Sequence, residues 1–184
     1  LQKEYNKQKI LYKIQKNKKF IALLNLYDSN TAHQQFNKLG DKTLIKIKIC
    51  FISNKLAAYS SVFRDRIGII TNLDNRFFDI YIAIWTKRES FITNPIVTHF
   101  LDPFIKNDKV IWLKKSKLSD NQKTIGSYKF HIIFYPDIGM LQDQTLLAYA
   151  RLAPIQITTW GHSDTSGNPS IDYFISSKYY EQML

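Results

Sequence analysis

Short apolar segments recur along the chain, separated mostly by stretches whose apolar residues have helical spacing. The strand-like segments are residues 44–53, 78–85, 110–113, 130–135, 155–160 and 171–175. The helix-like stretches are residues 62–73, 91–105 (interrupted by Pro95 and Pro103), 119–128, 143–152 (capped by Asp143) and 178–184. Strands that alternate with helices at intervals of roughly 25–30 residues indicate βαβ units and a mainly parallel sheet with helices on both faces. We therefore expect a Rossmann-like α/β fold.

The first forty residues follow another pattern. Residues 1–20 predict a lysine-studded helix, and Ser29 or Asn30 provides a cap for a second helix that ends at Gly40. We therefore expect a helical lead-in or linker over residues 1–40 and one Rossmann-like lobe over residues 44–184. Because the sequence starts at Leu1 and stops inside a helix-like pattern, we expect it to be a segment of a longer polypeptide.

The formal net charge of +11 invites a nucleic-acid-binding function. More than half of that charge comes from residues 1–20, which hold seven lysines and one glutamate. The remaining basic residues are spread thinly and form no Arg-rich stripe, so a solvated lysine face is the favoured interpretation. A nucleic-acid partner is therefore not expected.

The single cysteine, Cys50, lies in an apolar run and excludes a disulfide framework within one chain. Its position is typical of a small buried hydrophobic residue. No apolar run approaches the roughly 20 residues of a membrane span, and because no apolar segment with a cleavage site follows the lysine-rich start, we expect no secretory signal. We therefore expect a cytoplasmic protein without a membrane partner.

Ligands of parallel α/β sheets bind beyond the carboxyl ends of the strands. That rule selects four loops, at residues 53–61, 86–90, 136–143 and 161–170. The first of them lacks glycine, so the dinucleotide fingerprint is absent, and the chain has no Walker loop, HExxH, CxxC or serine-nucleophile elbow. These absences disfavour a nicotinamide dehydrogenase and a P-loop NTPase.

Two of these loops carry candidate catalytic residues. Asp137, between Pro136 and Gly139, could accept a proton or a hydroxyl hydrogen bond, although a simple turn explains the same residues equally well. His162 follows Gly161 in the next loop and could act as an imidazole base; a polar turn with a surface histidine is the equally weighted alternative.

The remaining candidates are binding residues. Asp164 lies two positions after His162, but two ligands do not make a metal site. Thr165, Ser166 and Gly167 offer small side chains and an approachable backbone, suited to phosphate or sugar hydroxyls. Arg64 and Arg66 flank Asp65 at the start of a helix; this pattern indicates either an anion-binding site or a surface ion pair.

The segment "YPDIGM…ARLAPIQITTWGHSDTSGNPSIDYFISS" resembles the O-GlcNAc transferase and SPINDLY-like protein glycosyltransferases. It is similar to that family's Pro/Asp/Gly turn, R-x-A-P-I-Q, W-G-H/Y, T-S/T-G and I/M-D-Y run. Weaker similarity covers "IKICFISNKLAAYSSVFRDRIGII", "FFDIYIAIW" and "LYDSNTAHQQFNKL". Together these segments span about residues 24–181.

The resemblance implies the first lobe of a two-lobed GT-B enzyme, which follows tetratricopeptide repeats in this family. The implied reaction transfers a sugar from a nucleotide sugar to a hydroxyl of an acceptor protein or peptide, without a metal or resident cofactor. A second lobe, outside these 184 residues, would hold most of the nucleotide. The implied acceptor-side residues are Tyr59, Pro136, Asp137, Gly139, Gly161, His162, Asp164, Thr165, Ser166 and Gly167. Arg151, Pro154 and Gln156 would position the strand that leads to them.

The chain departs from the family's pattern at three positions. Tyr59 stands where the family often has a histidine, Ser163 where it usually has a proline, and His131 where bacterial relatives commonly have an aspartate. The departure at Tyr59 motivates a second hypothesis, a catalytically degenerate glycosyltransferase-like binding module. A basic nucleic-acid-binding protein is the third and weakest hypothesis.

Overall fold

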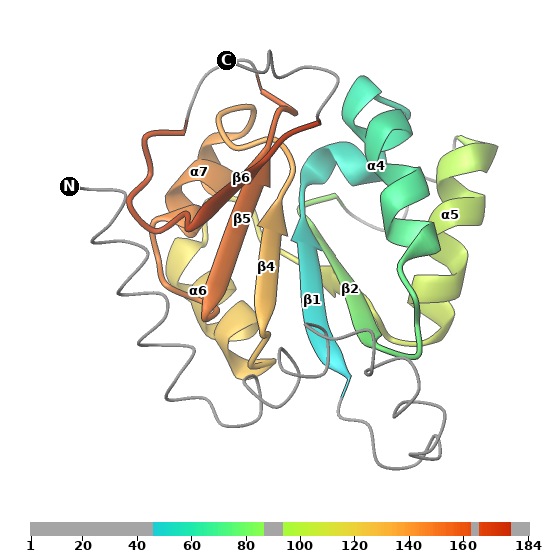
Figure 1. The fold of residues 1–184 in the computed structure, drawn as a ribbon, viewed down its shortest axis with the longest axis horizontal. Coiled ribbons are helices and arrows are strands. Elements are labelled where there is room, and N and C mark those ends of the chain that lie inside the picture. The colour runs from blue at the N-terminus through green and yellow to red at the C-terminus, as the bar shows by residue number, and fades with distance from the viewer. Residues whose placement is uncertain (1–45, 87–93, 163–165, 178–184) are drawn as a thin grey trace. The chain divides into compact units, whose positions relative to one another are not determined.

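The computed structural model describes residues 46–86, 94–162 and 166–177 (Figure 1). Its six strands form one parallel sheet in the order β3-β2-β1-β4-β5-β6. They are β1 (Ile47–Ile52), β2 (Phe78–Ile84), β3 (Val110–Trp112), β4 (Ile132–Tyr135), β5 (Ile155–Thr159) and β6 (Tyr173–Ile175). The predicted Rossmann-like α/β class is confirmed. The lead-in expected over residues 1–40 and the helix expected over 178–184 lie outside the described residues.

Helices cover both faces of the sheet (Figure 1). The 3-10 turn η1 (Asn54–Ala57), α4 (Ser61–Asn72) and α5 (Pro95–Lys106) pack on one face, and α6 (Leu118–Ser127) and α7 (Gln142–Ala148) on the other. Successive residues of a strand point to opposite faces, so β1 contributes Cys50 and Ile52 to one core and Ile49 and Phe51 to the other. This double burial explains why its sequence is continuously apolar.

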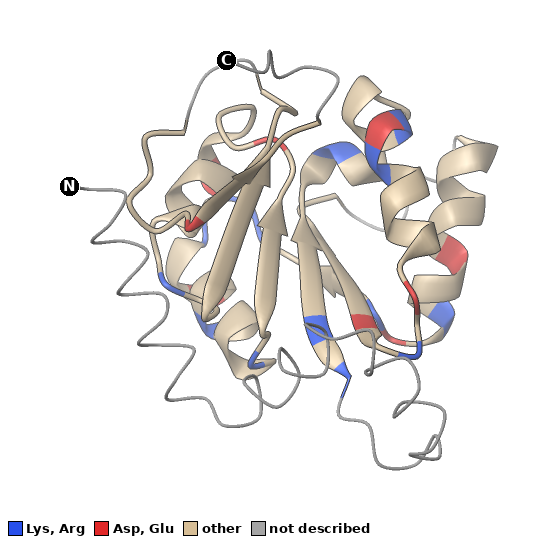
Figure 2. Ribbon diagram, viewed as in Figure 1, with Lys and Arg blue, Asp and Glu red and all other residues tan. Residues whose placement is uncertain are grey.

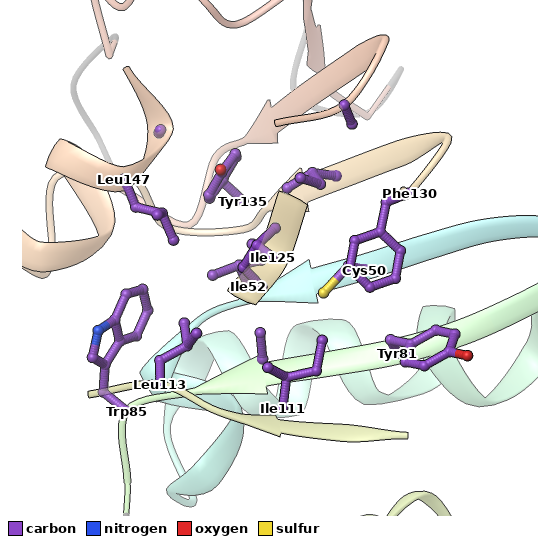
Figure 3. Packing of buried hydrophobic residues seen from close by; sticks show 14 of the residues in the cluster. Cys50, Ile52, Tyr81, Trp85, Ile111, Leu113, Ile125, Phe130, Tyr135 and Leu147 are labelled. Atoms are coloured by element: carbon purple, nitrogen blue, oxygen red, sulfur yellow. The ribbon is translucent and has the colours of Figure 1, made fainter. Parts of the chain in front are cut away.

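The core between the sheet and the pair α6 and α7 is shown in Figure 3. It contains Cys50, which is fully buried, and burial raises the pKa of its thiol well above the ordinary value. A thiol held in its neutral form is a poor nucleophile and a poor metal ligand. The expected role of Cys50 as a small buried hydrophobic residue is confirmed.

Helix starts differ from the expectation at two places. Pro95 does not interrupt α5 but begins it, with the Asn94 side chain as the cap, because a proline at the first helical position loses no helical hydrogen bond; Pro103 does lie inside the helix. The prediction that Asp143 caps α7 is wrong. The helix already begins at Gln142, and the Asp143 carboxylate instead accepts a hydrogen bond of 3.0 Å from the Ser116 amide.

Charge and hydropathy add two findings. The Lys and Arg residues of the described chain are spread over several elements, with Asp residues among them (Figure 2); the lysine-rich residues 1–20 lie outside the described residues. Among the described residues, no helix has both the length and the apolar content needed to cross a bilayer.

Candidate functional site

The sheet order places a topological switch point between β1 and β4. These strands are neighbours, but the chain leaves β1 toward α4 on one face and leaves β4 toward α7 on the other. Parallel α/β sheets bind their ligands where the connections diverge in this way, outside the carboxyl ends of the strands. Figure 1 shows the arrowheads of β1 and β4 at the same edge of the sheet. Ser53 follows β1 there, and Pro136 and Asp137 follow β4.

Asp137 is buried at this point and is held by a glutamine. The Nε2 atom of Gln144, on α7, donates one hydrogen bond of 2.8 Å to the Asp137 Oδ1 atom and another of 2.8 Å to the Ile52 carbonyl oxygen at the end of β1. Both side chains are almost fully buried, with exposed fractions of 1% for Asp137 and 0% for Gln144. The Asp137 carboxylate is therefore a fixed part of the switch point rather than the tip of a solvated turn.

Burial raises the pKa of Asp137, because a charged carboxylate loses its hydration there. Four side chains lower this pKa in part. Gln144 and Ser53 do so by hydrogen bonding to the carboxylate, and Lys55 and His162 do so by their charges. We refer to Ser53, Lys55, Asp137, Gln144 and His162 as the switch-point site. It combines one buried carboxylate with two groups that can carry positive charge.

Two glycines bring His162 to this site. Gly139 has a φ of +105°, and a Cβ atom there would lie 3.2 Å from the Nδ1 atom of His162, so the imidazole packs against bare backbone. A Cβ atom at Gly161 would lie only 2.1 Å from the Pro136 carbonyl oxygen. The turn after β4 and the loop after β5 therefore touch at positions where only glycine fits.

The structure brings together Pro136, Asp137, Gly139, Gly161 and His162, all expected to lie on one edge. Asp164 and Thr165 lie outside the described residues, as does Ser163. The Ser166 hydroxyl accepts a local hydrogen bond of 3.3 Å from the Asn168 amide, and Gly167 is an exposed loop residue with a φ of +55°.

Arg64 and Arg66, expected to hold an anion or to form a surface ion pair, lie in different surroundings, and an ion pair with Asp65 is present at Arg66. Arg66 is 1% exposed, pairs with the Asp65 carboxylate at 2.7 Å and donates a hydrogen bond of 3.3 Å to the Thr159 hydroxyl. Arg64 is exposed, with its guanidinium 5.7 Å from the ring centroid of Tyr59. The two side chains differ in exposure because residues two positions apart on a helix do not share a face.

Arg151, Pro154 and Gln156 lie at the opposite, amino edge of the sheet. Arg151 forms an ion pair with Asp172, whose carboxylate also accepts a hydrogen bond of 2.8 Å from the Gln156 amide. The buried Gln156 side chain accepts from the Leu152 amide at 3.0 Å and donates to the Ser170 carbonyl at 2.9 Å. Arg151 and Gln156 thus position β5, as expected, and Pro154 directly precedes that strand.

His131 also lies at the amino edge of the sheet. Its Nδ1 atom accepts a hydrogen bond of 2.8 Å from the Lys48 amide at the start of β1. An aspartate at this position offers the same kind of acceptor.

Sequence reasoning missed Ser53, Lys55 and Gln144. A signal for Gln144 exists: it precedes Leu147 and Ala148 by three and four positions, so a polar side chain interrupts the apolar face of a helix. For Ser53 and Lys55, the only signal in the sequence is their position directly after a buried strand. Within the described ranges, no three His, Cys, Asp or Glu side chains are grouped as metal ligands.

Comparison with known proteins supports the fold. No protein-family model matches the chain, and no curated protein matches its sequence. Among solved structures, the chain is similar to a Thermobaculum terrenum O-GlcNAc transferase carrying the K341M substitution, with a TM-score of 0.58 and 16% sequence identity. The similarity covers 74% of this chain and 25% of the transferase, so the chain spans about a quarter of that enzyme's length. The similarity is one of fold, in agreement with the Rossmann-like α/β class.

Proposed function

We propose that this chain supplies the acceptor-side lobe of a GT-B glycosyltransferase. The reaction transfers a GlcNAc-like hexose from a UDP-sugar or another nucleotide sugar to a Ser or Thr hydroxyl of a polypeptide. The observation that carries the proposal is the meeting of Asp137 and His162 at the switch point, where the Gly139 and Gly161 loops touch. The likeness in fold to an O-GlcNAc transferase supports it.

In such a transfer, the acceptor oxygen bonds to the anomeric carbon of the sugar. The bond between that carbon and the diphosphate breaks, the nucleoside diphosphate leaves with the electron pair, and the hydroxyl proton passes to a base. His162 is the proposed base, since its imidazole is partly exposed and can take up a proton. The buried Asp137 acts through His162, because a nearby carboxylate favours the imidazolium that forms.

The test is sugar transfer by the native polypeptide that contains these 184 residues. It is incubated with UDP-GlcNAc or other nucleotide sugars and acceptor protein, and the mass added to the acceptor is measured. We expect His162→Ala and Asp137→Asn each to lower turnover at least 100-fold, whereas His99→Ala, which alters an exposed histidine on α5, leaves it unchanged. A wild-type protein that neither transfers nor hydrolyses any nucleotide sugar would rule the proposal out.

The second candidate is a binding module of the same fold without turnover. It is favoured by Tyr59, which is 51% exposed and stands where the resembled family often has a histidine. In this case the wild type binds acceptor or donor but transfers no sugar, and Tyr59→His restores transfer. Robust wild-type turnover excludes this candidate.

A further inference from the structure

Gln144 is a buried amide that the proposed reaction does not use directly. Burying an amide in an apolar core costs free energy unless its polar atoms are paired. Here one atom, Nε2, makes two hydrogen bonds of 2.8 Å, to the Ile52 carbonyl and to Asp137 Oδ1, while Oε1 has no partner among the described residues. The amide orientation follows from the Ile52 carbonyl, which can only accept a hydrogen bond and so requires the nitrogen on its side.

The two partners of Gln144 belong to the two halves of the sheet. Ile52 ends β1, and Asp137 follows β4, so one amide connects both sides of the switch point. Its two N–H groups lie in one plane, which fixes the carboxylate relative to the end of β1. An ionised carboxylate can accept about four hydrogen bonds, so one bond from Gln144 orients Asp137 and leaves the rest of its capacity for other groups.

We propose that Gln144 is a positioning residue for Asp137, holding its carboxylate in a fixed orientation against the carboxyl end of β1. The position of the carboxylate follows from the hydrogen bonds alone; its use in catalysis rests on the proposed function. The charged groups that act on Asp137 are Lys55, from η1, and His162, from the loop after β5, and both favour the ionised carboxylate, as Gln144 does. Gln144 is the neutral member of this set, and it acts through direct hydrogen bonding.

The chain contains a matched control. Gln156 is also a fully buried glutamine with hydrogen bonds to backbone groups on either side, but it lies at the amino edge of the sheet. Replacing either glutamine by leucine keeps most of the side-chain volume and removes the amide. If Gln144 had only a structural role, both substitutions would lower the stability of the protein and neither would shift the titration midpoint of Asp137.

The test follows the Asp137 carboxyl directly, by NMR titration of its carbon in the native polypeptide that contains these residues. In Gln144→Leu the carboxylate loses a hydrogen-bond donor, so we expect its titration midpoint to move to higher pH than in the wild type. Gln144→Glu provides a second variant, whose carboxyl keeps the side-chain length but repels Asp137 when both are ionised, giving a coupled titration with a still higher second midpoint. In Gln156→Leu we expect no shift.

Sugar transfer by the native polypeptide separates this proposal from the proposed function. If transfer occurs, Gln144→Leu should lower kcat with KM nearly unchanged and move the acidic limb of the pH profile to higher pH; His99→Ala, at an exposed position on α5, should do neither. An Asp137 midpoint that is the same in wild type, Gln144→Leu and Gln144→Glu overturns the positioning role. If the Asp137 midpoint shifts in these variants but the protein transfers no sugar, the positioning role of Gln144 stands and the proposed transferase function is rejected.

Discussion

The guanidinium of Arg66 lies 4.1 Å from the ring centroid of Trp160, although the two residues come from opposite halves of the fold. Arg66 belongs to α4, which packs beside β1 and β2, whereas Trp160 directly follows β5. The hydrogen bond from Arg66 to Thr159 reinforces this stacking, and the Thr159 hydroxyl in turn donates to the Ile175 carbonyl at 2.7 Å. Because Trp160 precedes Gly161, this contact connects α4 to the loop that carries His162.

The first prediction concerns Arg66. Arg66→Ala removes a buried stacking contact and leaves a void, so we expect the free energy of unfolding to fall by about 2–4 kcal/mol. Arg64→Ala, two positions earlier and exposed, should change it by less than about 0.5 kcal/mol. Urea denaturation of both variants measures the difference. Equal effects of the two substitutions would contradict a specific role for the Arg66–Trp160 contact.

The second prediction concerns glycines. Gly161→Ala places a methyl group 2.1 Å from the Pro136 carbonyl oxygen, so the two loops must separate; we expect a loss of about 3 kcal/mol or more in the free energy of unfolding. Gly68 lies within α4 with open space around it, so Gly68→Ala should stabilise the protein by about 0.5–1 kcal/mol. Denaturant unfolding of the two variants should give changes of opposite sign in the free energy of unfolding. A Gly161→Ala protein as stable as the wild type would disprove the close approach of the loops.

The third prediction concerns pH. Because burial raises the pKa of Asp137 in the folded protein, the folded state holds this proton more tightly than the unfolded state does. Its contribution to stability is therefore fully present below the ordinary carboxyl pKa of about 3.9 and is lost as pH rises through the higher folded value. Asp137→Asn removes this dependence. As pH rises from the ordinary carboxyl pKa to the higher folded value, the stability of this variant relative to the wild type should increase, and above that range it should level off. Urea midpoints measured from acid to neutral pH test this, and parallel curves would refute it.

The fourth prediction concerns the amino edge of the sheet. Arg151→Met leaves the Asp172 carboxylate, whose side chain is 9% exposed, without its charged partner. We expect a loss of about 1–2 kcal/mol in the free energy of unfolding, moderated because Arg151 itself is partly exposed. The Asp137 titration midpoint should not move, since the ion pair lies at the other end of the strands. A shifted midpoint would show that the two edges are coupled.

The strands could be predicted because burial on both faces leaves a direct signal in the sequence. Residues such as Ile49, Cys50 and Phe51 form continuous apolar runs, and each run lies within or beside a strand of the structure. The helix starts were less predictable. The carboxylate of Asp143 has the chemistry of a helix cap, yet it bonds Ser116 from another loop, and that tertiary contact has no local sequence signal.

The candidate site was partly predictable for a related reason. Asp137, Gly139, Gly161 and His162 could be placed on one edge because they follow parallel strands. Their mutual contact depends on β4 and β5 being neighbours, which the strand order decides. Arg66 illustrates the limit: a charged residue near a helix start is normally exposed, and only the distant Trp160 and Thr159 explain its burial.

The pairing of β1 with β4 also bears on how the protein folds. β2 follows β1 and β5 follows β4 closely in the chain, so each half of the sheet can form from local contacts. Joining the halves requires partners such as Ile49 and Ile132, and Phe51 and Phe134, to meet across more than eighty residues. Closing a loop of that length is entropically costly, and such non-local pairings slow folding. We therefore expect the switch-point site to be assembled last and to be the first feature lost when the two halves separate.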